Sequence, residues 1–196
     1  MRIAARWLIR VGTLASLSVL SPVEAAAQVK AQVPPAAKPA WGKGIQPISR
    51  ESYYNVIECG KQGGASPACL FYDTDLCKND EFTLAMYTPY KMVAYTVWQA
   101  VQQKREPPNP SYPEAQKLRV VLGVKPRHTQ NPLTALAIKR GGRAIKAATQ
   151  TLDAGGGTFI FDFATFAPTA GIAIEMTGKA KTVTCQVDKA VLARFR

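Results

Sequence analysis

The chain has 196 residues, of which 47% are hydrophobic and 19% are charged, and its formal net charge is +12. It contains one histidine, His128, so a metal site built from several histidines is excluded. This length suits one domain with a hydrophobic core of its own.

The first 27 residues have the three parts of a secretory signal peptide. Arginines near the start are followed by an apolar run over 11–20 and by alanines at 25–27. The apolar run is too short to span a bilayer, and no second hydrophobic stretch of about 20 residues follows. We therefore expect residues 1–27 to be removed on export, and the mature protein to be secreted or periplasmic with no transmembrane segment.

Residues 28–49 form a leader in which prolines stand among alanines, lysines and glycines. Few apolar residues are available for burial, which favours a flexible or extended segment. We expect residues 50–196 to form a single domain. A strand, an acidic loop and a helix are expected over 50–117, and a β-domain over 118–196.

The four cysteines, Cys59, Cys69, Cys77 and Cys185, are even in number, which is typical of structural disulfides in an exported protein. They can pair in three ways, and the sequence does not choose between these. We favour a local bridge between two of the first three cysteines and a long-range bridge from the remaining one to Cys185. Their spacings do not match the close pairs of a zinc site, so no metal is expected on them.

Residues 52–59 are predicted to form a first strand, which is followed by a loop. An acidic stretch then runs over 73–81. Asp73 and Asp75 have the alternation of a calcium loop, but the glycine that the turn requires is absent. A solvated loop beside a disulfide is therefore favoured, and calcium binding by Asp73 and Asp75 is the weaker hypothesis.

A helix is predicted to begin at Thr88, which can act as the N-cap of a first turn containing Pro89. It must end by Glu106, because the prolines that follow cannot continue a helix. The apolar face expected to pack on the β-domain comprises Tyr90, Val93, Ala94, Val97, Trp98 and Val101, whereas Lys91 and several glutamines lie away from it. Ser111 and Glu114 have the spacing of a capping box and predict one further turn.

From residue 118 onward, short aliphatic segments alternate with glycine turns, which predicts a series of strands. These segments are 118–124, 133–140, 144–152, 158–163, 172–176 and 182–187. Gly141 and Gly142 can both adopt the positive φ angles of a two-residue turn, so a hairpin is expected there.

Phe159, Phe161 and Phe163 fall on one face of a strand, where we expect them to form the centre of the core. An exposed stacking platform for sugars is the less favoured alternative. The predicted fold is mostly β, with α+β possible. It is an antiparallel β-sandwich of about six to seven strands with one amphipathic helix packed on it.

Positive charge is concentrated in the C-terminal part of the chain. Residues 118–196 carry twelve basic and four acidic residues, a net charge of +8, whereas residues 50–117 carry −1. A basic domain attracts polyanions. The basic residues around the predicted hairpin are the candidate binding patch: Lys139, Arg140, Arg143 and Lys146. The alternative is that these are ordinary solvated side chains that keep strand edges unpaired.

The chain lacks a Gly-x-Ser-x-Gly elbow and a phosphate-binding Gly-x-x-x-x-Gly-Lys, and a Ser/His/Asp site would have to use His128. We therefore expect no catalytic residue and no cofactor. The predicted function is a binding or structural module of the cell envelope. Its partner would be an anionic envelope component or a protein rather than chromosomal nucleic acid. The alternative is a small secreted hydrolase that uses carboxylates of the 73–81 loop.

Overall fold

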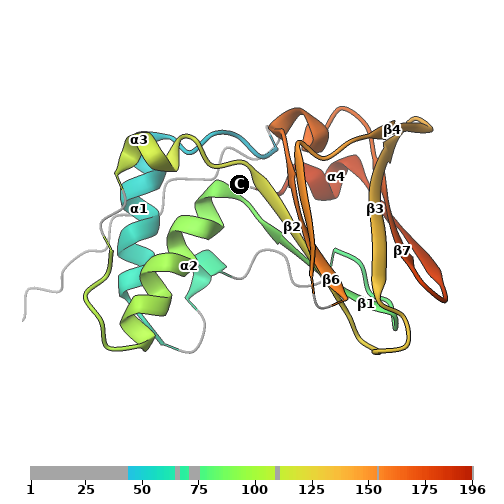
Figure 1. Cartoon of the computed structure of the whole chain (residues 1–196). Helices are drawn as coiled ribbons and strands as arrows, with labels where there is room; N and C mark the ends of the chain where they lie inside the picture. Colours follow the sequence, from blue (N-terminus) through green and yellow to red (C-terminus); the bar gives the residue numbers. More distant parts are fainter. Residues whose placement is uncertain (1–43, 65–66, 71–75, 109–110, 154, 196) are drawn as a thin grey trace, which may run out of the picture. The chain divides into compact units, whose positions relative to one another are not determined.

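The computed structural model describes residues 44–195 apart from 65–66, 71–75, 109–110 and 154 (Figure 1). These residues belong to one compact unit, Pro39–Arg196. The expected signal peptide and most of the expected leader lie outside the described residues. Asp73 and Asp75 also lie outside them.

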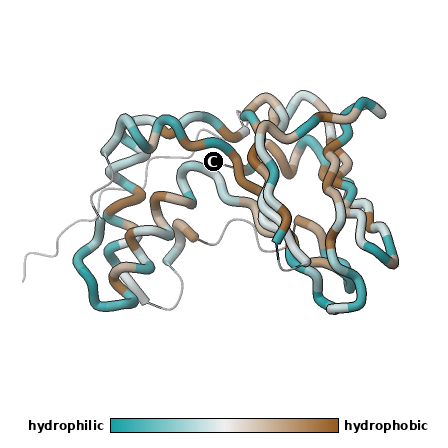
Figure 2. Tube along the Cα trace, in the orientation of Figure 1, coloured by the Kyte–Doolittle hydropathy of each residue, from teal (hydrophilic) through white to brown (hydrophobic). Residues whose placement is uncertain are grey.

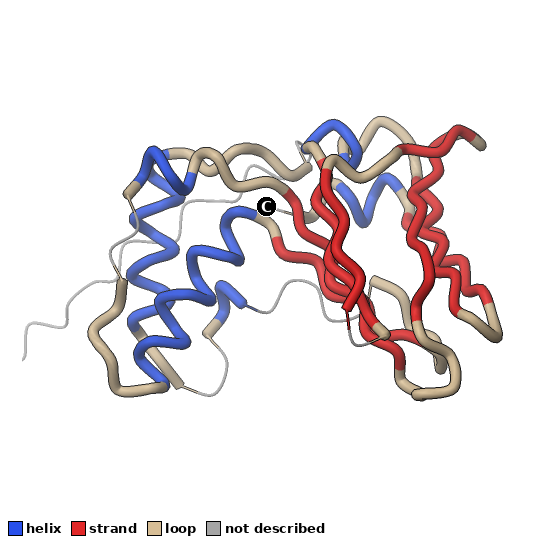
Figure 3. The backbone as a smooth tube through the Cα atoms, viewed as in Figure 1, coloured by secondary structure: helices blue, strands red, loops and turns tan. Residues whose placement is uncertain are grey.

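The described part of the chain combines helices with two four-stranded antiparallel sheets, so it is α+β with strands predominating (Figure 3). The first sheet has the order β1-β2-β6-β5 and the second β4-β3-β7-β8. The strands are β1 (Phe82–Tyr87), β2 (Val120–Pro126), β3 (Leu133–Arg140), β4 (Arg143–Ile145), β5 (Thr149–Asp153), β6 (Gly156–Phe161), β7 (Ile172–Gly178) and β8 (Thr182–Val187). The helices are α1 (Arg50–Lys61), α2 (Pro89–Gln102), α3 (Tyr112–Ala115), α4 (Lys189–Leu192) and the 3-10 turns η1 (Ala68–Leu70) and η2 (Phe163–Phe166).

Both sheets contribute side chains to one hydrophobic core. Phe159 and Phe161 are fully buried in it, as the alternation of the sequence predicts. Phe163 differs, because β6 ends at Phe161 and Phe163 begins the 3-10 turn η2. The Phe163 ring is half-buried at the edge of the core, where its centroid lies 5.5 Å from the Arg119 guanidinium.

The predicted hairpin is confirmed. Gly141 and Gly142 have φ angles of 54° and 79° and join β3 to β4, with Arg140 paired to Arg143. Figure 2 shows that the tip of this hairpin is hydrophilic. The positive φ angles of both glycines are a backbone conformation that other residues rarely adopt.

The single strand predicted over 144–152 is wrong. β4 ends at Ile145 and β5 begins at Thr149, and the two strands belong to different sheets. No glycine or proline marks the crossing over 146–148. This split, together with β1, gives eight strands within the described residues instead of the six or seven expected.

β1 is a strand that the sequence analysis did not predict. Phe82, Leu84 and Met86 alternate along it and are all buried, which is the period of a strand with one face on the core. This alternation of apolar residues is visible in the sequence, but it lies between the acidic loop and the start of the predicted helix.

The strand predicted over 52–59 is also wrong, since this segment lies in α1. Ser49 is the N-cap, and its hydroxyl accepts a hydrogen bond from the Ser52 N–H at 3.1 Å. Tyr53, Val56 and Ile57 are buried at helical spacing. α1 packs on α2 at Gly60, where a Cβ atom would lie 2.9 Å from the Ala94 carbonyl oxygen.

α2 begins as predicted, because the Thr88 hydroxyl accepts a hydrogen bond from the Lys91 N–H at 3.2 Å. The further turn predicted from Ser111 and Glu114 is confirmed as α3, where Ser111 is the N-cap and its hydroxyl accepts a hydrogen bond from the Glu114 N–H. Lys91 was placed on the polar face of the helix, and this is wrong. Its side chain is 8% exposed and its Nζ donates to the Met86 carbonyl at 3.1 Å.

Two disulfides join the four cysteines in the pattern that we favoured. Cys59 pairs with Cys69 across 10 positions, and Cys77 pairs with Cys185 across 108 positions. The first links α1 to η1, and the second links the start of the β region to β8. Two disulfides indicate an oxidising environment.

Candidate functional site

The basic residues predicted as a binding patch lie on and beside the β3–β4 hairpin, but they do not share one role. Lys139 forms an ion pair with Glu175 of β7, with Nζ and Oε2 2.8 Å apart. This carboxylate balances the charge of Lys139 locally. Lys139 is therefore a weak candidate for binding an external anion.

Arg140 turns toward the protein rather than toward solvent. Its guanidinium donates hydrogen bonds to the backbone carbonyls of Ala164, Thr165 and Ala167, at 3.2, 2.7 and 2.9 Å. These carbonyls belong to η2 and its C-terminal end, where a cation stabilises exposed carbonyl groups. Arg140 belongs to the second sheet, and η2 follows the last residue of β6 in the first sheet. The hydrogen bonds of Arg140 therefore connect the two sheets.

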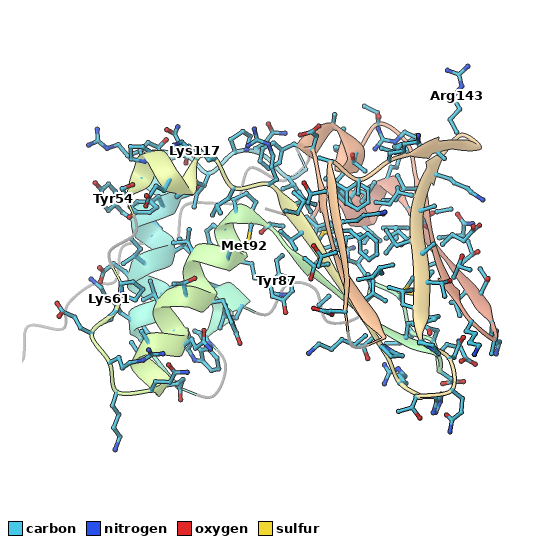
Figure 4. The ribbon with its side chains drawn as sticks, viewed as in Figure 1. Tyr54, Lys61, Tyr87, Met92, Lys117 and Arg143 are labelled. Carbon is cyan, nitrogen blue, oxygen red and sulfur yellow. A yellow bond between two sulfur atoms is a disulfide. The ribbon has the colours of Figure 1, made fainter. Side chains whose placement is uncertain are left out.

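Arg143 and Lys146 are exposed. Figure 4 shows Arg143 projecting away from the ribbon at the hairpin. Of the four predicted patch residues, these two keep cationic groups that can reach an external ligand.

Strand polarity brings further basic residues to the same end of the two sheets. β3 ends opposite the start of β7, and β6 ends opposite the start of β2. The hydrogen bonds of Arg140 to η2 join these two edges. We define the basic end as the exposed cations placed there: Arg119, Arg143, Lys146, Lys189 and Arg194.

Two carboxylates share the basic end, those of Asp162 and Asp188, and both are exposed. Asp162 lies 3.5 Å from the Arg119 guanidinium, whose side chain remains 44% exposed. The basic end therefore has five exposed cations and two exposed carboxylates within the described structure.

Arg119, Lys189 and Arg194 were not predicted from the sequence to belong to one site. Arg119 stands directly before β2, Lys189 begins α4 and Arg194 follows α4. Their positions in the sequence give no sign of proximity, because the strand order decides which ends meet. Only the high charge of residues 118–196 pointed toward them.

Of the carboxylates of the 73–81 loop, the structure describes those of Asp80, which is exposed, and Glu81, which lies at the opposite end of the sheets. Its Oε1 lies 3.0 Å from Lys181 Nζ, and its Oε2 accepts a hydrogen bond from Asn131 Nδ2 at 3.0 Å. These hydrogen bonds hold the pKa of the Glu81 carboxyl below its ordinary value. The ionised form of Glu81 is therefore stabilised by two donors, and such a carboxylate is poorly suited to act as a general acid.

Where side chains are described, no group of three or more His, Cys, Asp or Glu residues is arranged to hold a metal ion. No helix among the described ranges is long and apolar enough to cross a membrane. No family model, no curated protein and no solved structure matches the chain.

Proposed function

We propose that this chain is an exported, non-catalytic binding module that recognises an anionic polymer through the basic end. The observation that supports this proposal most directly is the gathering of five exposed cations, with two carboxylates, at one end of the sheets. The net charge of +8 on residues 118–196 adds a long-range attraction for polyanions.

The arrangement favours a polymer over a small anion. Arg119 precedes β2, Arg143 and Lys146 flank β4, and Lys189 and Arg194 follow β8. Cations on separate segments can contact successive charges of an extended chain. A compact anion would instead need donors that converge on one point.

The fold orders the backbone of the hairpin that carries Arg143. Arg143 lies on a hairpin whose turn is fixed by two glycines, and Arg140 ties that hairpin to η2. A backbone that is already ordered loses little further freedom when a ligand binds, so the entropy cost falls on the cationic side chains. Binding should also weaken steeply with salt, because each neutralised ligand charge releases counterions.

The test is the affinity of the purified protein for fluorescein-labelled heparin, measured by anisotropy over a series of salt concentrations. Heparin serves as a model polyanion. We expect Arg143→Glu with Lys146→Glu to weaken binding by about tenfold or more and to lower the slope of log affinity against log salt.

The matched control is Lys125→Glu with Lys179→Glu. Both lysines are exposed and lie at the opposite end of the sheets. Replacing them changes the net charge by the same amount as the test pair. The control should lose clearly less affinity. If both pairs weaken binding equally, net charge alone attracts heparin and the basic end is not a site.

A second control addresses the hydrolase alternative. Asp73→Asn with Asp75→Asn removes two carboxylates of the 73–81 loop and should leave heparin affinity the same or slightly higher. A large loss of heparin binding in this variant would contradict binding through the basic end.

A further inference from the structure

β5 (Thr149–Asp153) is an edge strand. It is the last strand in the order of the first sheet, so among the described residues it is paired with β6 alone. All five of its residues are exposed. An edge strand presents a row of unpaired N–H and C=O groups, which is a template for pairing with another strand.

β1, at the other edge of the same sheet, is engaged by side chains. Asn79 Oδ1 accepts a hydrogen bond from the Phe82 N–H at 2.7 Å. Lys91 Nζ donates to the Met86 carbonyl at 3.1 Å. Phe82 and Met86 are an even number of positions apart, so their backbone groups point to the same side of the strand. That side of β1 therefore already has partners within the chain.

The two edge strands of the second sheet are protected in other ways. β4 has only three residues and begins with Arg143. β8 is joined to the segment before β1 by the Cys77–Cys185 disulfide. β5 has the sequence Thr-Gln-Thr-Leu-Asp, without lysine, arginine or proline. It therefore lacks the short length and the residues that commonly keep strand edges apart.

β5 also carries the first sheet beyond the hydrophobic core. Gln150 is paired with Phe159 and Leu152 with Gly157, and residues directly opposite each other share one face of a sheet. Phe159 and Gly157 are buried, whereas Gln150 is exposed and Leu152 is 46% exposed. The core-facing side of the sheet therefore ends in an uncovered leucine.

The sequence of β5 is complementary to itself in antiparallel register. When two copies are aligned so that all five residues pair, Thr151 faces Thr151 of the second copy. On one side of the sheet Thr149 then faces Asp153, and on the other side Gln150 faces Leu152. No like charges are opposed, and a threonine pair is favourable on a sheet face. Each exposed leucine gains a neighbour on the core-facing side.

We propose that the chain forms a two-fold symmetric dimer in which the β5 strands of two copies pair antiparallel. The two four-stranded first sheets then become one continuous sheet. The contact is small, so we expect weak association, with a dissociation constant on the order of 0.1 mM. Because β5 begins at the basic end, the basic ends of the two copies lie at opposite ends of the joined sheet. The dimer therefore does not depend on polyanion binding.

The test is analytical ultracentrifugation of the purified protein at concentrations from about 5 µM to about 1 mM, without polyanion. We expect monomers at the low end and a rising share of dimers above it. Thr151→Lys should prevent dimerisation, because it opposes two like charges at the two-fold axis. Thr83→Lys makes the same change at an exposed position of β1 and should dimerise like wild type.

A mixture of Thr151→Lys with Thr151→Glu separates a contact from damage to the strand. In the mixed pair the lysine faces the glutamate, so the mixture should contain dimers although each variant alone stays monomeric. Mixing would not restore dimers if Thr151→Lys had simply disordered β5. A mixture that stays monomeric would therefore overturn the proposal.

Three other results would also overturn it. The first is wild-type protein that remains monomeric at about 1 mM. The second is an equal loss of dimers in Thr151→Lys and Thr83→Lys, which would assign the effect to net charge. The third comes from hydrogen exchange of the β5 amides that are not bonded to β6. A second copy should slow their exchange only at high concentration, whereas slow exchange in dilute monomer would mean that another segment of the same chain covers the edge.

Discussion

Asn131 Nδ2 donates a hydrogen bond to Glu81 Oε2 at 3.0 Å, although the two residues are 50 positions apart. The Asn131 Oδ1 accepts from the backbone N–H groups of Ala180 and Lys181 at 2.9 and 3.1 Å. One side chain, 3% exposed, therefore joins the start of β1 to the turn between β7 and β8. It satisfies backbone donors that a turn would otherwise present to solvent.

Asn131→Asp should destabilise the protein strongly. The substitution removes the donor to Glu81 and places a second carboxylate next to it, in a position with little access to water. We expect the free energy of unfolding to fall by about 2–4 kcal/mol, measured by urea denaturation. Gln130→Glu makes the same change of charge at the exposed neighbouring position and should change stability by less than about 0.5 kcal/mol.

Glu81 should make stability depend on pH in the acid range. Its pKa is lower in the folded protein, because Lys181 and Asn131 donate hydrogen bonds to the ionised carboxylate. The resulting stabilisation is present above the unfolded pKa of about 4.3 and is lost as pH falls through the folded pKa. Glu81→Gln should therefore be less stable than wild type at pH 7, and this difference should shrink on acidification. A difference that stays constant from pH 7 into the acid range would show that ionisation of Glu81 is not its cause.

Gly178→Ala should disturb the same contact from the other side. A Cβ atom on Gly178 would overlap the Asn131 side-chain amide, so either the amide or β7 must move. We expect a loss of about 1–3 kcal/mol from overpacking. Gly123→Ala is the matched control, because a Cβ atom there meets Tyr87 at an ordinary 3.7 Å. Equal melting temperatures for the two variants would contradict the expected clash.

The two disulfides should differ in their contribution to stability. Closing a loop of 108 residues removes more chain entropy from the unfolded state than closing one of 10 residues. The chain-entropy model gives about 5 kcal/mol for the long loop and about 3 kcal/mol for the short one. Urea denaturation of Cys77→Ala/Cys185→Ala and of Cys59→Ala/Cys69→Ala would compare them. A larger loss for the short loop would mean that local packing, not chain entropy, dominates.

Arg140→Lys should lower stability without altering heparin binding. A lysine keeps the charge but cannot reproduce the guanidinium fork that contacts three carbonyl groups. We expect a loss of about 1–3 kcal/mol by thermal or urea unfolding. Arg143→Lys, at the exposed partner position, should leave stability unchanged. A loss of heparin affinity in Arg140→Lys at full folding would show that Arg140 contacts the ligand after all.

Local chemistry explains what could be predicted from the sequence. The Gly141-Gly142 turn, the Thr88 cap and the alternation of Ile172, Ile174 and Met176 each depend on neighbouring residues alone. The favoured division of the cysteines into one local and one long-range pair also held. Apart from the cysteine pairing, the geometry in each case follows from a few consecutive side chains.

The errors arose where tertiary contacts decide. The segment 52–59 is rich in residues that favour strands, but it is helical, with Ser49 as its N-cap and its buried face packed against α2. The crossing over 146–148 carries no breaking residue. Arg140 was expected to bind a ligand because of its charge, whereas the carbonyl groups that it contacts lie more than 20 positions away.

The Cys77–Cys185 bond closes a covalent ring that contains β1 through β7 and part of β8. A protease that cuts once within this ring, for example at the exposed Gly141-Gly142 turn, leaves both fragments attached to each other. The nicked protein should migrate as a single chain until a thiol reductant is added. In an oxidising environment, damage to the exposed hairpin therefore need not separate the two halves of the β region.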